Sequence, residues 1–146
     1  LWQISAFTVA HPVTLALGAL GLVSISPAIV EPLIALSIAF VAIENIFSTN
    51  LHRWRPVVVF AFGLLHGLGF ASVLSELDLP PARLVVGLIG FNIGVELGQL
   101  LVIAVAYLTV GLWFGNKPWY RNVIVIPGSL AIALIASYWV LERTIL

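Results

Sequence analysis

The chain has 146 residues, of which 62% are hydrophobic and only 8% are charged, against about 45–50% and 25% in a soluble domain. Six basic and six acidic residues give zero net charge, so the composition offers no electrostatic basis for binding nucleic acid. The lack of cysteine and methionine excludes disulfides and thiolate or thioether metal sites, so any bound metal must have nitrogen and oxygen ligands.

The hydrophobic pattern predicts an all-α fold, a polytopic transmembrane bundle of about five helices in one domain over residues 1–146. Crossing a bilayer takes about 20 apolar residues in a helix. The expected spans are residues 4–25, 28–47, 57–74, 84–106 and 123–141. The chain opens without an initiator Met or a cleavable signal pattern, and we expect it to begin inside a longer gene product.

The first two spans meet at a short connection. Pro12 should kink the first helix near His11. Ser26 followed by Pro27 resembles a helix cap and a first helical position, so a second helix is expected to start there. A connection this tight predicts that the first two helices are antiparallel neighbours.

Two loops carry most of the basic charge. Residues 48–56 contain Arg53 and Arg55, and residues 115–122 contain Lys117 and Arg121, whereas residues 75–83 are acidic on balance. Because loops rich in Lys and Arg remain in the cytoplasm, the two basic loops are expected inside. This orientation puts Leu1 inside and Leu146 outside.

Four ionisable side chains lie within the expected spans: His11, Glu44, His66 and Glu96. Each costs about 2.5–3.5 kcal/mol to insert and therefore needs a physical reason to be there. At about 1.5 Å per residue, all four fall about 6–15 Å from the basic-loop side, in one half of the bilayer. Two imidazoles and two carboxylates suit Ni²⁺, Co²⁺, Zn²⁺ or Fe²⁺, and they would equally suit a proton relay.

Helical spacing indicates which polar groups share a face. Residues three or four apart lie on one side of a helix, which groups Asn92 and Gln99 with Glu96, and Thr8 with His11. We expect Thr8, Asn92 and Gln99 to orient the metal ligands.

Small residues predict where helices come close. Gly63 and Gly67 flank His66, and a glycine recurs every fourth residue from Gly90 to Gly98. This spacing allows near-contact of backbones. The third and fourth helices are therefore expected to press together around His66 and Glu96.

Simpler explanations exist for three of the four ionisable residues. His11 could bond a carbonyl freed by Pro12, and His66 could have a packing role in its glycine-rich helix. Glu44 lies nearest the interface and could extend its carboxylate toward water, or it could pair with Arg53 or Arg55. Glu96 has no basic residue within its own span and is the hardest to assign to structure alone.

Four segments of the chain resemble the HupE/UreJ family of hydrogenase and urease accessory membrane proteins. They are FTVAHPVTLALGAL at 7–20, VEPLIALSIAFVAIEN at 30–45, FGLLHGLGFAS at 62–72 and FNIGVELGQ at 91–99. The resemblance implies a bacterial inner-membrane protein linked to nickel uptake. The matching motif positions are His11, Glu31, Glu44, Asn45, His66, Asn92, Glu96 and Gln99, which adds Asn45 to the residues expected to orient ligands.

The chain departs from the family pattern in two ways. It lacks an upstream helix with a His-x-x-x-Gly-x-Asp-His pattern, which the family resemblance leads us to expect as a source of further ligands. A partner subunit could supply that helix. In addition, Pro12 follows His11 where Ser is more usual.

Three functions are consistent with these features. The leading hypothesis is a permease or metal-delivery protein for a divalent transition metal, with nickel favoured and zinc or cobalt as alternatives. The second is an intramembrane zinc-dependent hydrolase. The third is a structural subunit of a larger membrane complex. The first and third predict no catalytic residue.

Overall fold

The computed structural model describes residues 2–48, 52–76 and 80–145. Helix accounts for 87% of these described residues, and no strand occurs among them. The predicted all-α fold of five helices is confirmed.

The helices follow one another with short connections. The first three are α1 (Trp2–Ala19), α2 (Pro27–Phe47) and α3 (Arg55–Glu76). The fourth, α4 (Pro81–Ala106), continues through a π-helical turn η1 (Tyr107–Gly111) into α5 (Leu112–Phe114). The last begins with a second π-helical turn, η2 (Arg121–Val125), and continues as α6 (Ile126–Ile145).

The end of α1 differs from the sequence prediction. Hydrophobicity continues to Ile25, but the helix ends at Ala19 because Gly21 adopts a left-handed conformation with φ of 71°. The Gly21 N–H donates to the Gly18 carbonyl and the Leu22 N–H donates to the Leu17 carbonyl, both at 2.9 Å. This pair of hydrogen bonds is a Schellman cap. The helix α2 begins at Pro27 as predicted, although the Ser26 side chain makes no capping hydrogen bond.

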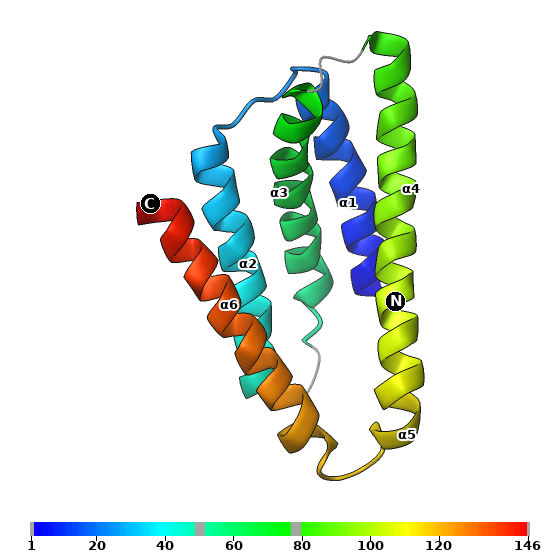
Figure 1. Cartoon of the computed structure of the whole chain (residues 1–146), viewed down its shortest axis with the longest axis vertical. Coiled ribbons are helices and arrows are strands. Elements are labelled where there is room, and N and C mark those ends of the chain that lie inside the picture. The colour runs from blue at the N-terminus through cyan, green and yellow to red at the C-terminus, as the bar shows by residue number, and fades with distance from the viewer. Residues whose placement is uncertain (1, 49–51, 77–79, 146) are drawn as a thin grey trace.

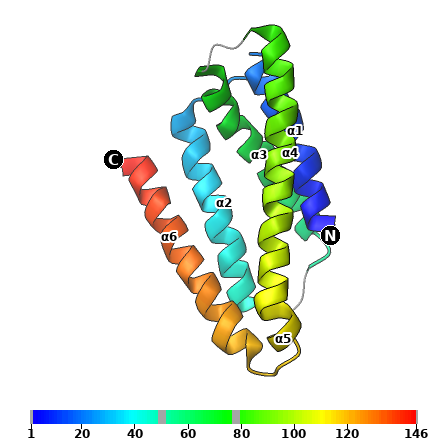
Figure 2. The same cartoon turned by 45° about the vertical axis from the view of Figure 1, so that its right-hand side comes forward.

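The five helices stand side by side in the order α6, α2, α3, α1, α4 (Figures 1 and 2). The main helix contacts are α6 with α2, α2 with α3, α3 with α1, and α1 with α4. The prediction that the first two helices are neighbours is wrong, because α3 lies between them. The prediction that α3 and α4 press together is also wrong, because α4 packs on α1.

Gly63 and Gly67 of α3 pack against α1 and not against α4. A Cβ on Gly63 would lie 2.8 Å from the Ala10 Cβ, and a Cβ on Gly67 would overlap the His11 carbonyl and Thr14 Oγ1. Thr14 Oγ1 donates to the Leu64 carbonyl of α3 at 2.8 Å. Small residues and one interhelical hydrogen bond thus hold α1 and α3 together, as is usual for helices in lipid.

Three glycines of α4 meet no neighbour. A Cβ on Gly90, Gly94 or Gly98 has no atom within 4 Å. The helix α4 is attached to the rest of the molecule mainly through the side that faces α1.

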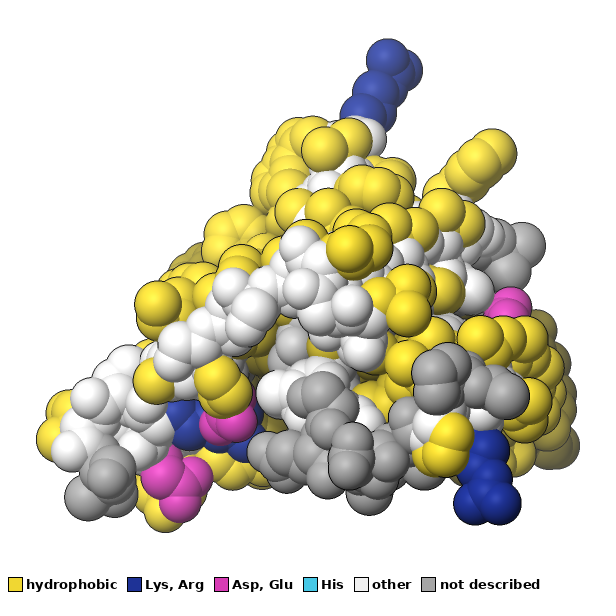
Figure 3. Space-filling view, turned by 90° about the horizontal axis from the view of Figure 1, so that it is seen from above, with side chains coloured by type: hydrophobic (Ala, Val, Ile, Leu, Met, Phe, Trp, Pro, Cys, Tyr) yellow, Lys and Arg dark blue, Asp and Glu magenta, His cyan; other side chains and the backbone are white. Residues whose placement is uncertain are grey.

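The outer faces of the helices are apolar, as a bilayer requires. Four helical segments are long and apolar enough to cross a membrane: Pro27–Phe47, Arg55–Leu74, Arg83–Phe114 and Arg121–Ile145. Seen from one end of the bundle, hydrophobic side chains cover much of the visible surface and charged side chains appear at a few separate places (Figure 3). These are features of an integral membrane protein. The shorter α1 is not among the four segments.

Candidate metal site between α1 and α4

A cavity of about 120 Å³ lies between α1 and α4. Its polar lining consists of five residues that the sequence analysis grouped as ligands or their orienting partners. The full lining is Phe7, Thr8, His11, Pro12, Asn92, Ile93, Val95, Glu96 and Gln99. We call it the His11 cavity. The helical spacing therefore identified residues that converge on one place from two helices.

His11 is buried without a polar partner. The residue is 2% exposed, and neither Nδ1 nor Nε2 has a hydrogen-bond partner. Aromatic rings hold the imidazole instead: Phe7 and Phe91 stack on it at centroid distances of 5.5 and 6.2 Å, and Phe70 meets it edge-on at 5.7 Å. The simpler explanation, a bond from His11 to a carbonyl freed by Pro12, is not what the structure shows.

Two more lining atoms of the His11 cavity are buried and unpaired. Thr8 Oγ1 and Gln99 Oε1 have no hydrogen-bond partner. A buried polar atom left unpaired costs about 1–3 kcal/mol. Four such atoms, counting both nitrogens of His11, belong to residues around one small cavity, and a polar guest could satisfy them.

The α4 side of the cavity supplies a carboxylate. Glu96 is not covered by neighbouring helices, and it forms no ion pair with any residue that the structure describes. Asn92 Nδ2 donates to the Leu88 carbonyl at 2.7 Å, which ties this amide group to its own helix. The imidazole of His11 and the carboxylate of Glu96 are the two strong metal-ligating groups of the cavity.

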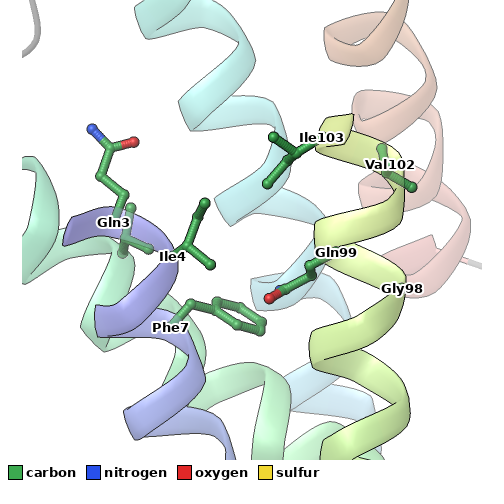
Figure 4. Close-up of a pocket in the computed structure, with 8 residues that line it drawn as sticks. Gln3, Ile4, Phe7, Gly98, Gln99, Val102 and Ile103 are labelled. Atoms are coloured by element: carbon green, nitrogen blue, oxygen red, sulfur yellow. The ribbon is translucent and has the colours of Figure 1, made fainter. Parts of the chain in front are cut away.

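A larger cavity of about 540 Å³ adjoins the first one between α1 and α4. Phe7 and Gln99 line both cavities. Figure 4 shows the Phe7 ring projecting from α1 toward α4 and the Gln99 side chain reaching back toward that ring. The remaining lining of this larger cavity is mostly aliphatic.

His66 lies outside the His11 cavity. It lines a cavity of about 300 Å³ among α2, α3 and α6, together with Ser37, Asn45 and Ser129. We call this the His66 cavity. His66 Nδ1 lies 2.8 Å from the Phe62 carbonyl. Since a carbonyl only accepts, Nδ1 carries the proton and Nε2 is left to accept a proton or bind a metal.

Glu44 is engaged in an ion pair at the end of α2. Arg55 Nε lies 3.4 Å from Glu44 Oε2, and the two side chains are 9% and 10% exposed. Arg55 Nη2 also donates to Asn45 Oδ1 at 2.6 Å. Arg121 Nη2 donates to the Asn45 and Ile46 carbonyls at 3.3 and 2.9 Å. Glu44 and Asn45 therefore bind two arginines, Arg55 and Arg121, and these contacts join α2, α3 and η2.

Four ionisable residues of the expected spans, predicted as a set of metal ligands, thus occupy three places. His11 and Glu96 line one cavity, His66 lines another, and Glu44 pairs with Arg55. Within the described ranges, no group of three or more His, Cys, Asp or Glu residues could hold a metal. Metal ligation by these residues remains a prediction.

Sequence reasoning missed Phe7. This residue lines both the His11 and His66 cavities, and its ring contacts both imidazoles. Its position four residues before His11 was an available signal, because such residues share a helix face.

Comparison with known proteins gives one match. A family model described as "HupE / UreJ protein" matches residues 1–143. Neither the curated proteins nor the solved structures give a significant match.

Proposed function

Because the chain belongs to the HupE/UreJ family, we propose that it is a membrane permease or metal-delivery protein for a divalent transition metal. Nickel is the favoured ion, and zinc and cobalt are the alternatives. The family suggests a role in metal transport or as an accessory protein, and the four apolar spans fit a protein that acts in a membrane. We place it in a bacterial inner membrane with the loops at 48–56 and 115–122 in the cytoplasm.

The observation that carries this proposal is the His11 cavity. Polar atoms inside a membrane protein are costly unless they are paired or line a water-filled or ligand-filled space. His11, Thr8 and Gln99 all keep unpaired buried atoms there. In our proposal the ion binds His11 and Glu96, while water and the amide or hydroxyl oxygens complete its shell. Two protein ligands give the modest affinity that a transported ion needs in order to leave again.

His66 and Glu44 take different parts in the proposal. His66 contributes Nε2 as a ligand from its own cavity. Glu44 can become a ligand only when its ion pair with Arg55 opens, which would cost the energy of that pair. Asn45 would then change partner as well, because its side-chain oxygen accepts from Arg55.

The alternative of an intramembrane zinc hydrolase has less geometric support. A catalytic zinc site takes three protein ligands and an open position for water. The part of the chain that the structure describes brings together no three-residue ligand group. A role as a structural subunit leaves the unpaired atoms of the His11 cavity without an explanation.

The decisive experiment measures nickel binding and uptake with matched variants. Purified protein is titrated with Ni²⁺, and uptake of radioactive nickel is followed in proteoliposomes. We expect His11→Ala and Glu96→Gln each to weaken binding by at least about tenfold. This factor corresponds to about 1.4 kcal/mol of binding free energy for the lost ligand. Glu142→Gln removes the same charge outside the cavity and should leave both measurements unchanged. If Glu96→Gln binds and takes up Ni²⁺ as well as the wild type does, the proposed site is ruled out.

A further inference from the structure

Among the residues that the structure describes, Phe7 alone lines both the His11 cavity and the His66 cavity. The two cavities otherwise have different walls, one between α1 and α4 and the other among α2, α3 and α6. A side chain common to both is the partition between them.

The ring of Phe7 contacts both imidazoles. It stacks on His11 with a centroid distance of 5.5 Å and an interplanar angle of 12°. It meets His66 edge-on at 5.4 Å with an angle of 69°. An ion that passes between the two cavities at Phe7 would meet this ring, and a phenyl group offers a transition metal no nitrogen, oxygen or sulfur ligand.

Each imidazole can hold an ion on its own side. His11 has two ring nitrogens without partners. His66 presents Nε2, because its Nδ1–H donates to the Phe62 carbonyl. In the His66 cavity the hydroxyls of Ser37 and Ser129 and the amide of Asn45 line the same space, and together with water they could complete the shell of a weakly bound ion.

The ring has room to move. Phe7 also borders the cavity of about 540 Å³ between α1 and α4 (Figure 4). Rotation about the first side-chain torsion, a motion of nanoseconds or slower for a packed ring, can carry the phenyl group into that space. The partition can therefore open without separating α1 from α3.

We propose that the ion occupies two stations in series, one at His11 and Glu96 and one at His66, and that the Phe7 ring controls its passage between them. This inference rests on the proposed function and adds the path that the ion follows. It also explains why His11 and Glu96 do not share a pocket with His66, because a transported ion meets the two stations one after the other. No covalent or redox step is involved.

The test changes the size of the side chain at position 7 in both directions. Phe7→Ala removes the partition and should raise the rate of Ni²⁺ uptake into proteoliposomes by about tenfold, equivalent to about 1.4 kcal/mol in the barrier. Phe7→Trp fills the adjoining space and should lower the rate by a similar factor. Phe7→Leu keeps most of the bulk and should fall between the wild type and Phe7→Ala. The three variants should differ more in uptake rate than in equilibrium binding of Ni²⁺, because Phe7 itself supplies no metal ligand.

Phe60 of α3 provides the matched control. It is 39% exposed and lines neither the His11 nor the His66 cavity. Phe60→Ala and Phe60→Trp should therefore leave the uptake rate near the wild-type value. Rates that fall in both Phe7→Ala and Phe7→Trp, or that match those of the Phe60 pair, would overturn the partition. Absence of Ni²⁺ binding by the wild type would instead overturn the proposed function, and the partition with it.

Discussion

Two glutamates within the membrane spans, Glu44 and Glu96, lie in different electrostatic environments. Glu44 is neutralised by Arg55 in an ion pair that is nearly covered by neighbouring helices, although neither carboxylate oxygen accepts a hydrogen bond from the residues described. Glu96 has no ion-pair partner among the residues described and borders a cavity with unpaired polar atoms. A carboxylate without a partner in lipid is costly, so this second arrangement is the one that points to a ligand.

The first prediction concerns the buried ion pair. Glu44→Gln removes the carboxylate and leaves the Arg55 guanidinium, which cannot lose its proton, without its counter-ion. Removing one partner of a buried pair should lower the free energy of unfolding by about 3 kcal/mol. Denaturant unfolding in detergent micelles measures this loss.

Glu31 provides the comparison for that experiment. Its carboxylate lies 3.7 Å from Arg143, but the two side chains are 47% and 37% exposed. Glu31→Gln should therefore cost only about 0–1 kcal/mol. Equal unfolding curves for Glu44→Gln and Glu31→Gln would show that burial of the Arg55 pair contributes nothing.

At the residue scale, the spacing along one helix predicted which of its side chains share a face, whereas the sequence did not predict which helices lie beside each other. The spacing of Thr8 from His11, and of Asn92 and Gln99 from Glu96, identified side chains that share a cavity wall. The sequence left open whether Glu44 pairs with Arg53 or Arg55 or binds a metal. That choice depends on which helix lies beside α2, which periodicity does not encode.

Among the helices, the closest approach is between α1 and α3. The small residues predicted a close contact between helices, since a glycine lets another backbone approach. They did not predict which helix makes that contact: Gly63 and Gly67 were expected to face α4, but they pack against α1. The end of α1 was also misplaced, because a hydrophobic connection from Leu20 to Ile25 has the composition of a helix.

The second prediction tests this contact. In Gly67→Ala, the new Cβ would overlap the His11 carbonyl and Thr14 Oγ1, both on α1. Overpacking of this kind should destabilise the protein by about 2 kcal/mol. Because the same backbone carries His11, the Ni²⁺ affinity should fall as well. Unfolding and Ni²⁺ titration of the same preparation measure both effects.

Gly94→Ala is the control for Gly67→Ala. A Cβ on Gly94 meets no atom within 4 Å, so the alanine should be neutral or stabilise the helix by up to about 1 kcal/mol. A loss of stability in Gly94→Ala as large as that in Gly67→Ala would mean that the α4 glycines are packed and the α1–α3 contact is not special.

On the scale of the whole molecule, the number of helices followed from the sequence and their order did not. Stretches of about 20 apolar residues define membrane spans by a simple length requirement. The order α6, α2, α3, α1, α4 depends on a few contacts between small residues, because apolar side chains pack against lipid about as well as against one another. A row of helices in a different order would have the same hydropathy.

This row puts both basic loops at one end of the bundle. Arg121, which belongs to the loop at 115–122, donates to carbonyls at the end of α2, where the loop at 48–56 begins. Figure 1 shows the α2–α3 connection and the connection after α5 at the same end, opposite the α1–α2 connection. If the bundle spans a membrane in this arrangement, the two loops share one side, and their Lys and Arg content predicts that this is the cytoplasmic side.

The third prediction tests that orientation with single cysteines, which is straightforward because the chain has none. His52→Cys and Asn116→Cys report on the basic loops, and Ser24→Cys and Pro80→Cys report on the opposite end; no substitution removes a Lys or Arg. In intact cells, a maleimide that cannot cross the inner membrane should label only Cys at positions 24 and 80. Positions 52 and 116 should react only after permeabilisation. Labelling of 52 and 116 from opposite sides would contradict the fold itself, whereas labelling of both in intact cells would reverse the orientation and leave the fold intact.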